Sequence, residues 1–366
     1  MSSERLRVAM VATPDDGSCG VGTYAGDLRA VLADEAVAVD HVELATNTRS
    51  PLHVARVAWR AGTADVDAVH LQHEYGLFGP MTYLWWAFAP VLFLLSRLRG
   101  VPVVVTLHEA WDRETTGETA AWLQYAYVRL VNWSLALLAD RLVFLSDSRA
   151  EAFTGTVETS HATRLPHGVN LVDAEPTVDA RDRLGYDPED TLVVEPGYVS
   201  PQKGADTFLE LAERFPDAEF LLAGGARTPG DEAFIGELES QAPENLQITG
   251  VLDDELFRGV FDAAGLAVLP YRKQGQSGIL NWCIAYGLPV VAGDVDYFRE
   301  VADEWDCVGL FDPDDIDDAA AAVDQYLTDP EAREQLAAGM EQFRTENSFA
   351  AVARRHADLY AALAGD

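Results

Sequence analysis

The sequence contains almost no lysine. Lys203 and Lys273 are the only lysines in 366 residues, whereas arginine occurs 24 times and 60 acidic residues leave a formal net charge of −34. Abundant Asp and Glu with so little Lys is typical of adaptation to a salt-rich cytoplasm, where salt screens a highly charged surface. An ordinary acidic protein is the alternative interpretation, and the near-absence of lysine makes it the weaker one.

Basic surface and cysteine are scarce as well. No basic face is visible in the sequence, which argues against DNA or RNA as a partner. The three cysteines, Cys19, Cys283 and Cys307, are widely spaced and form no CxxC pair. Such usage indicates reduced thiols and a cytoplasmic chain. We expect no signal peptide before the first strand, which begins near Leu6.

No hydrophobic run is long enough to span a bilayer. Residues 81–95 form an apolar stretch of fifteen residues that contains a proline, and residues 122–138 form a second, aromatic one. Two interpretations apply to both segments. They are helices that cover the core of a doubly wound sheet, or helices that dock on a membrane surface.

The membrane interpretation has a slight advantage for the first segment. Its aromatic side chains are Trp85, Trp86, Phe88 and Phe93, followed by Arg97 and Arg99. Aromatic residues beside arginine are typical of a membrane interface. Residues 1–170 have a charge balance of only −6, from 19 acidic and 13 basic residues, whereas residues 171–366 hold 41 and 13, a balance of −28. We therefore expect peripheral membrane contact through the first half, at the inner face of the cell membrane. The competing account is that Trp85 and Phe88, three residues apart, share a helix face and pack on the sheet.

The pattern of apolar runs predicts two α/β domains. The apolar run Leu266–Leu269, together with residues 270–292, reads as strand, Gly-rich loop, helix, tight turn and a second strand at Val290–Ala292, which is one parallel βαβ unit. The same alternation fills both halves of the chain. Strands are expected at Leu6–Ala12, Val37–Leu44, Val66–Gln72, Val101–Leu107, Arg141–Leu145, Thr191–Glu195, Glu219–Ala223, Leu246–Thr249 and Val308–Phe311, with a linker at Leu171–Asp190.

The loop of this βαβ unit predicts an anion site. Free backbone N–H groups and the positive end of a helix meet where the helix begins. Ser277 is expected to cap the helix, while Gly275 and Gly278 let a ligand approach the backbone. Arg272 and Lys273 add positive charge beside the loop. We interpret this loop as the pocket for the diphosphate of a nucleotide.

Polar side chains also follow the strands of the first half. His73 follows the third strand and His108 the fourth, where the ligand crevice of an open α/β sheet lies. A lone histidine is more often structural, but this location favours a functional one. The turn Gly20-Val21-Gly22 after the first strand is common in nucleotide-binding folds, and a plain tight turn explains it about as well.

With these motifs in order, the chain resembles the family-4 glycosyltransferases of the GT-B fold over nearly its whole length. The motifs that carry the resemblance are Gly20-Val21-Gly22, His73-Glu74, Thr106-Leu107-His108, Leu165-Pro166-His167-Gly168-Val169, Ser200-Pro201-Gln202-Lys203-Gly204, Gly250-Val251-Leu252 and Ala285-Tyr286-Gly287-Leu288-Pro289-Val290-Val291. The resemblance implies two Rossmann-like domains that face each other across a cleft. The expected divisions are an acceptor-side domain at 1–170, a nucleotide-sugar-binding domain at 171–345, and a C-terminal helix at 346–366 that returns to the first domain.

The resemblance also implies an activity and roles for individual residues. Such enzymes transfer a sugar from a nucleotide diphosphate sugar with retention of configuration, without a metal or another cofactor. Lys203 would neutralise the leaving diphosphate, and as one of two surviving lysines it carries weight of its own. His108 or His73 would reach the sugar or the acceptor. The donor pocket would be lined by Gly20, Gly22, Val251, Gln274, Gln276, Ser277 and Gly278.

Three positions depart from the family pattern. Gln274 and Trp282 stand where the family usually shows paired glutamates, and Tyr198 stands where an Arg is common, five residues before the lysine. The Gln276-Ser277-Gly278 version resembles a known branch of the family. The missing ribose-binding carboxylate puts the usual ribose contacts in doubt.

Three hypotheses about function follow, two for an enzyme and one for a binding protein. The leading hypothesis is an enzyme that moves a sugar from a nucleotide diphosphate sugar to a lipid-linked or polymeric envelope glycan. The second is a catalytically weak GT-B protein that binds nucleotide-sugar or an assembly partner, which Gln274 and Trp282 favour. The third, a nucleotide-sugar epimerase of the same fold, is opposed mildly by the His73-Glu74 and Lys203 motifs.

Overall fold

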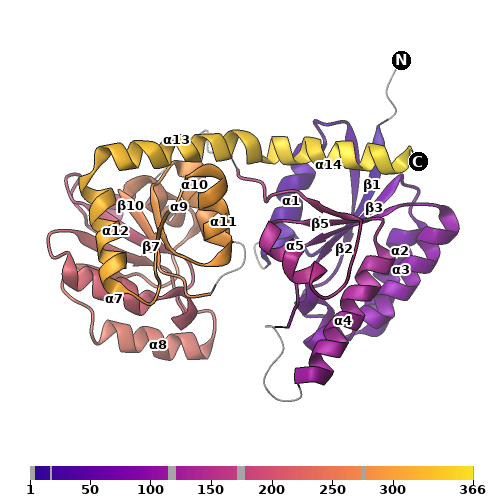
Figure 1. The fold of residues 1–366 in the computed structure, drawn as a ribbon, viewed down its shortest axis with the longest axis horizontal. Helices are drawn as coiled ribbons and strands as arrows, with labels where there is room; N and C mark the ends of the chain where they lie inside the picture. The colour runs from indigo at the N-terminus through magenta and orange to yellow at the C-terminus, as the bar shows by residue number, and fades with distance from the viewer. Residues whose placement is uncertain (1–4, 17–18, 114–120, 171–177, 274–276, 366) are drawn as a thin grey trace. The chain divides into compact units, whose positions relative to one another are not determined.

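The computed structural model describes residues 5–16, 19–113, 121–170, 178–273 and 277–365. The chain divides into two compact units (Figure 1). Unit 1 comprises Met1–Gly168 and Phe349–Asp366, and unit 2 comprises Val169–Ser348. The last helix of the chain, α14 (Phe349–Ala364), thus belongs to the same unit as the first strand.

Unit 1 is built on a parallel six-stranded sheet in the order β2-β1-β3-β4-β5-β6. Its strands are β1 (Leu6–Ala12), β2 (Val37–Glu43), β3 (Ala68–His73), β4 (Val103–Leu107), β5 (Arg141–Phe144) and β6 (Ala162–Arg164). Its other helices are α1 (Gly20–Leu32), α2 (Pro51–Thr63), α3 (Trp85–Arg99), α4 (Ala121–Leu138) and α5 (Asp147–Thr154). Strand β6 was not expected, because its three residues are half-buried and form no apolar run.

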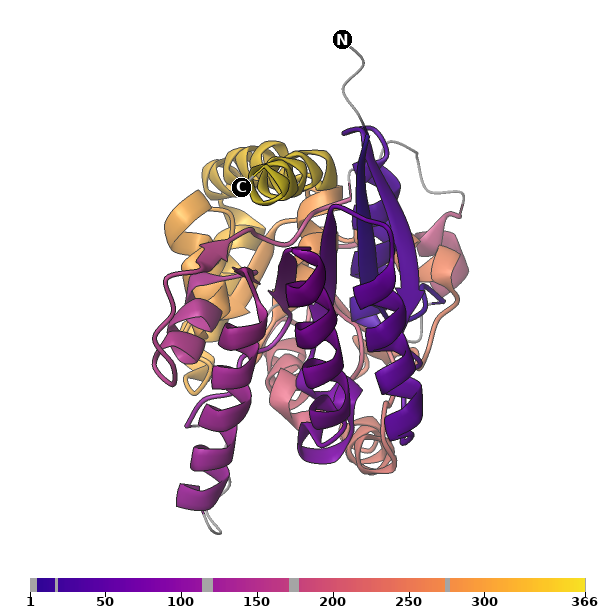
Figure 2. The ribbon, with the colours of Figure 1, turned by 90° about the vertical axis from the view of Figure 1, so that its right-hand side faces the viewer.

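Alternate residues of β1 show how the two faces of this sheet are covered. Ala9 and Val11 pack into a core with α2, α3 and α4, whereas Val8 and Met10 pack with α1 and α14. Continuous apolar strands such as this one are typical of parallel sheets with helices on both faces. The helices α2, α3 and α4 lie side by side in one layer (Figure 2).

Unit 2 has a second parallel six-stranded sheet, in the order β12-β11-β10-β7-β8-β9. Its strands are β7 (Leu192–Pro196), β8 (Glu219–Ala223), β9 (Leu246–Ile248), β10 (Leu266–Leu269), β11 (Val290–Gly293) and β12 (Gly309–Phe311). Its helices are α6 (Ala180–Leu184), α7 (Ala205–Arg214), α8 (Pro229–Glu239), α9 (Asp254–Ala263), α10 (Gly278–Tyr286), α11 (Asp296–Trp305), α12 (Ile316–Thr328) and α13 (Pro330–Asn347). The expected βαβ unit is confirmed as β10-α10-β11, with β10 and β11 paired in parallel. Of the expected linker, residues 171–177 lie outside the described chain.

The expectation that α3 inserts its aromatic residues into a membrane is wrong for two of the four residues named. Trp85 and Phe88 are fully buried in the core of unit 1, and the Trp85 indole donates a hydrogen bond to Ser134 Oγ at 2.7 Å. Their three-residue spacing places them on the face of α3 that packs against the rest of the unit, as the competing account predicted. The other two keep exposed surface: Trp86 is 38% exposed, and Phe93 is half-buried.

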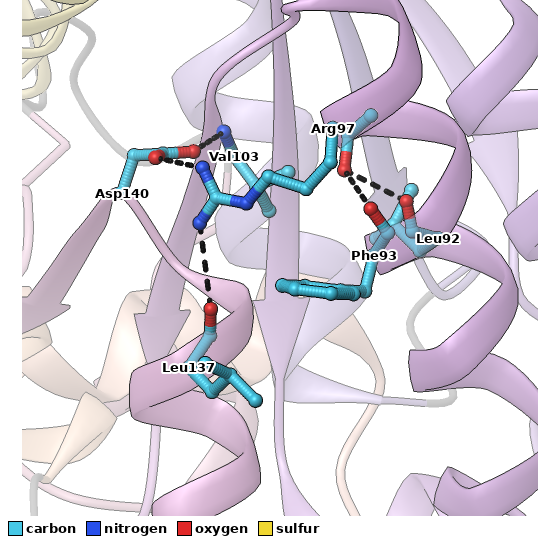
Figure 3. A network of polar contacts seen from close by, with 7 residues as sticks. Leu92, Phe93, Arg97, Val103, Leu137 and Asp140 are labelled. Atoms are coloured by element: carbon cyan, nitrogen blue, oxygen red, sulfur yellow. Dashed lines mark hydrogen bonds and ion pairs between the residues drawn. The ribbon is translucent and has the colours of Figure 1, made fainter.

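Phe93 and Arg97 are occupied within unit 1. The Arg97 guanidinium lies 5.4 Å from the centre of the Phe93 ring and pairs with Asp140 at 2.6 Å (Figure 3). It also donates to the Leu137 carbonyl. Arg97 therefore joins α3 to the end of α4, and both its charge and the Phe93 ring are used in packing.

Helix α3 also exposes Leu94 and Leu98, and α4 carries a larger exposed apolar surface that includes two tryptophans. Trp122, Leu130, Trp133 and Leu137 are 47–73% exposed and follow one another at helical spacing on one stripe. Beside them lies a surface pocket of about 740 Å³ between α4 and the residues that follow α5, Thr154–Glu158. Among the helices that the structure describes, none combines the length and the apolar character needed to cross a bilayer.

Candidate functional site

The sheet of unit 2 has its switch point between β7 and β10. From β7 the strands continue through β8 to β9 on one side, and from β10 through β11 to β12 on the other. Ligands of open α/β sheets bind outside the carboxyl ends of the strands at such a point. Lys203 follows β7, and Ser277 and Gly278 follow β10. The predicted donor residues of unit 2 thus lie on both sides of the switch point.

Close backbone packing brings Lys203 next to the start of α10. A Cβ atom at Gly197 would lie 3.3 Å from Lys203 Nζ and 3.0 Å from Ile279 Cδ1. Gly204, with φ +77°, ends the short 3-10 helix Pro201–Lys203, and a Cβ there would meet the Pro270 carbonyl oxygen. Only glycine fits this left-handed and crowded position. The segment that carries Lys203 therefore packs directly against the loop that leads into α10.

A buried carboxyl group lies beneath the lysine. Glu195 is 2% exposed at the end of β7, and its Oε2 atom has no hydrogen-bond partner among the described residues. Burial raises the pKa of Glu195 well above its ordinary value, while the positive charge of Lys203 acts in the opposite direction. Burial also lowers the pKa of Lys203, and Glu195 opposes that change. Lys203 Nζ lies 5.1 Å from the centre of the Tyr271 ring.

The cap predicted for α10 is confirmed. Ser277 Oγ accepts a hydrogen bond from the Leu280 N–H at 3.2 Å, and Gly278 has open space around its α-carbon. The first turn of α10 therefore presents backbone N–H groups beside Lys203, as an anion site requires. Gln274 and Gln276 lie outside the described residues. Arg272 is already paired, because its guanidinium binds both carboxylate oxygens of Asp206 at 2.8 and 2.9 Å.

Val251 lies along the same edge of unit 2. Its side chain is 74% exposed after β9, and a Cβ at Gly225 would lie 2.7 Å from Val251 Cγ2. The loop after β8 is thereby held next to Val251. Lys203, Ser277 and Val251 belong to the segments that follow β7, β10 and β9, and Gly278 begins α10, all at one edge of one sheet.

The glycine pair of unit 1 has two different roles. Gly22 is buried, its N–H donates to the Cys19 carbonyl at 3.0 Å, and a Cβ there would meet the Pro14 carbonyl oxygen. Gly20 is exposed at the first position of α1 with open space around it. Gly22 thus allows close packing of α1, and Gly20 is the member of the pair that a ligand can approach.

The two histidines differ in their surroundings. His73 is fully buried, lies between the rings of Tyr75, Phe78 and Trp85, and has no hydrogen-bond partner among the described residues. Burial lowers the pKa of His73 to about 3. His108 is half-buried and its Nε2 lies 2.9 Å from Gln72 Oε1. Burial, reinforced by His167 and His73, lowers the pKa of His108 to about 3, so its imidazole is neutral at pH 7.

Sequence reasoning missed the residues that hold His108. Gln72 and His70 lie on β3, which was predicted from its apolar residues, so these two polar residues were not singled out. Polar residues at alternate positions of a buried strand were the available signal, because a buried polar side chain needs a partner. Within the described part of the chain, no three His, Cys, Asp or Glu residues converge as a metal site. The expected independence from metal stays a prediction.

Comparison with known proteins identifies the family. The family described as "Glycosyl transferases group 1" matches residues 191–329. The phosphatidyl-myo-inositol mannosyltransferase of Mycobacterium leprae is 30% identical over 308 residues, which cover 81% of this chain and 73% of the relative. Other curated relatives are matched over 45–67% of their length.

Solved structures share the fold. Sucrose-phosphate synthase from Thermosynechococcus elongatus has a TM-score of 0.75 and 18% identity, with 98% of this chain and 99% of that chain covered. Anabaena HepE, solved in complex with UDP-glucose, has a TM-score of 0.72 and 15% identity, with 98% and 100% covered. The α/β fold of the GT-B type and the expected enzyme class are confirmed, and the chain belongs to the glycosyl transferases group 1 family.

Proposed function

We propose that the protein transfers a sugar from a nucleotide diphosphate sugar to a lipid-linked or envelope glycan acceptor, with retention of configuration. The observation that carries the proposal is the meeting of Lys203 with the first turn of α10 at the switch point of unit 2. In a chain of charge −34, a lysine and a free helix N-terminus side by side favour an anionic ligand. HepE, whose fold is similar, is described as a complex with UDP-glucose.

Lys203 and the α10 N-terminus would act on the leaving group. When the bond between the sugar and the diphosphate breaks, negative charge develops on the diphosphate oxygen. Fixed positive charge and N–H dipoles beside that oxygen stabilise the transition state more than the ground state. The neutral His108 is suited to hydrogen-bond a hydroxyl of the sugar or acceptor, and its half-buried position makes it a better candidate than the enclosed His73. No metal is needed in this scheme.

The acceptor side of the proposal rests on α4. The Mycobacterium leprae relative is named for a phosphatidyl-inositol acceptor. The helices α2, α3 and α4 contain no Asp or Glu, although the chain has 60 acidic residues. An apolar stripe on a helix without negative charge, in a layer with two other such helices, suits the surface of an anionic membrane. We propose that the enzyme docks by α4 at the cytoplasmic face of the membrane, in a salt-rich cell.

Product analysis tests the proposed activity. The purified protein is incubated in high KCl with membrane extract and a panel of UDP-, GDP- and ADP-sugars, with and without EDTA. Mass spectrometry should show a glycolipid or glycan increased by one sugar, and NMR of the product should show the anomeric configuration of the donor. An inverted product, or a requirement for metal, would contradict the proposal.

A binding protein without transfer is the second candidate. Trp282, partly buried in the core of unit 2, stands where the family usually has a glutamate, so the usual carboxylate is absent there. The same panel separates the candidates. A protein that binds nucleotide but forms no product with any donor is a binding module, and one that converts the donor into an epimer without acceptor is an epimerase.

A further inference from the structure

Tyr198 in unit 2 stands where the family resemblance predicts an arginine, so position 198 supplies no positive charge. The side chain of another arginine, Arg227, lies beside Tyr198. The Arg227 guanidinium lies over the Tyr198 ring, 5.6 Å from its centre. We infer that Arg227, from the loop after β8, supplies the second positive charge that binds the donor diphosphate beside Lys203. This inference rests on the proposed function.

Two backbone hydrogen bonds hold the loops of Tyr198 and Arg227 together. The Gly197 N–H donates to the Ala223 carbonyl at 3.0 Å, and the Val199 N–H donates to the Gly225 carbonyl at 3.0 Å. The two backbones also pack so closely that a Cβ atom at Gly224 would collide with the Gly197 carbonyl oxygen. The two strand-end loops thus extend as a pair beyond the sheet, and this pairing brings Arg227 over the Tyr198 ring.

Arg227 keeps its charge available. Four other exposed arginines of unit 2 are paired with carboxylates: Arg183 with Asp253, Arg214 with Asp317, Arg272 with Asp206 and Arg299 with Asp294. Arg258, on α9, lies over the Trp282 ring instead. Arg227 forms no ion pair with any residue that the structure describes, although acidic residues outnumber basic ones by more than two to one. Arg227 follows the carboxyl end of β8, at the edge of the sheet where ligands bind, and an unpaired arginine at that edge points to an external anion.

Arg227 also lies close enough to Lys203 to affect its charge. The positive charge of Arg227 contributes to lowering the pKa of Lys203, after the larger effect of burial. A diphosphate between the two groups would remove this repulsion. It would also extend from Lys203 toward Val251, because Gly225 of the Arg227 loop contacts Val251. A planar guanidinium presents two parallel N–H donors to two phosphate oxygens in a fixed geometry that the ammonium group of a lysine lacks.

The test is a binding titration of the whole protein in fixed KCl. Wild type, Arg227→Ala and Arg227→Lys are titrated with UDP, GDP and ADP and with the matching monophosphates. Arg227→Ala should weaken binding of the preferred diphosphate about tenfold or more, with a smaller effect on the monophosphate, because one charge-assisted contact is lost. Arg227→Lys should recover only part of the affinity.

Arg214→Ala is the matched control. Arg214 pairs with Asp317 at the far end of α7, away from the carboxyl edge of the sheet, and its loss should leave nucleotide affinity unchanged. Diphosphate affinity equal to wild type in a folded Arg227→Ala variant would overturn the inference. If wild type binds a diphosphate through Arg227 but transfers no sugar, the proposed activity fails and this assignment stands. If wild type binds no nucleoside diphosphate at all, both are overturned.

Discussion

The Nδ1 atom of His70 lies 2.6 Å from the hydroxyl oxygen of Tyr360, although 290 residues of chain separate the two. His70 Nε2 accepts from the Gln72 amide nitrogen at 3.2 Å, and Gln72 Oε1 accepts from His108 Nε2 at 2.9 Å. Thr106 also bonds His70 Nε2, at 2.8 Å. Helix α14 is therefore connected through β3 to the candidate catalytic His108. The connection leaves His108 Nδ1 as the nitrogen without a proton, able to accept from a substrate hydroxyl.

Removal of the Tyr360 hydroxyl should weaken this network. Tyr360→Phe leaves the buried His70 Nδ1–H without an acceptor, so the free energy of unfolding should fall by about 1–3 kcal/mol. Denaturant unfolding measures this. Tyr83→Phe, at a 42% exposed position of the same unit, should change stability by less than about 0.5 kcal/mol. Equal stability of wild type and Tyr360→Phe would show that the hydroxyl contact contributes nothing.

Local signals in the sequence were enough for the elements and for part of the site. Helix α10 was predicted with its Ser277 cap because an apolar run, a Gly-rich loop and a Gly-Leu-Pro turn all lie within 23 residues, and the cap bond to Leu280 is observed. The faces of α3 were not settled by the sequence. Spacing of three residues puts Trp85 and Phe88 on one face, but it does not say whether that face meets the core or a membrane.

Contacts between distant segments could not be predicted. His70 and Tyr360 meet because α14 packs on the same face of the sheet as α1, and no local pattern encodes that. Arg227 reaches Tyr198 through the pairing of β7 with β8, which sets two loops side by side. Arg272 appeared free in the sequence because Asp206, its partner, lies 66 residues away.

Lys203→Ala should reduce sugar transfer by about two orders of magnitude or more, as loss of one preorganised charge contact typically does. The loss of Lys203 also removes a charge that stabilises ionised Glu195, so stability must be measured separately from turnover. Glu195→Gln, which keeps the shape of the side chain but cannot ionise, is the companion variant. Turnover of Lys203→Ala equal to wild type at saturating donor would exclude Lys203 from the mechanism.

Acidification should destabilise unit 1. All eight histidines lie in unit 1, and burial lowers the pKa of five of them: His73 and His108 to about 3, His167 and His356 to about 4, and His70 well below its ordinary value. Below the unfolded value near 6.5, the unfolded chain binds protons that the folded chain does not. Stability is therefore full above about pH 6.5 and falls as pH drops toward about 4, by up to about 1.4 kcal/mol per pH unit for each histidine.

His356→Leu isolates the contribution of one histidine to the pH dependence of stability. His356 Nε2 is buried without a described partner, so an apolar replacement should cost little at pH 7.5. Between pH 7.5 and 5.5 the variant should lose about 1 kcal/mol less than wild type in urea unfolding at constant KCl. If the variant and wild type lose the same free energy of unfolding between these pH values, the low pKa assigned to His356 is wrong.

Low salt should destabilise the protein if its acidity is an adaptation to salt. Residues 171–366 carry a charge balance of −28, and dilution below about 1 M KCl removes the screening between those charges. The melting temperature should therefore rise with KCl. Measurement with NaCl at equal ionic strength separates general screening from binding of potassium. A melting temperature independent of salt would exclude this explanation.

Removal of the α4 stripe should abolish membrane binding. Trp122 and Trp133 are 73% and 53% exposed on α4, and each large apolar side chain that inserts contributes roughly 1.5–3 kcal/mol. The double variant Trp122→Ser/Trp133→Ser should therefore lower the partition onto anionic lipid vesicles at least about tenfold, measured by co-sedimentation in high KCl.

Trp59→Ser is the matched control, because Trp59 is 59% exposed on α2, on the other side of α3. If the control loses as much binding as the double variant, the whole layer of α2, α3 and α4 docks rather than α4. Folded wild type that stays in the supernatant would mean that the stripe meets something other than a lipid surface, since its four large apolar side chains remain uncovered within unit 1.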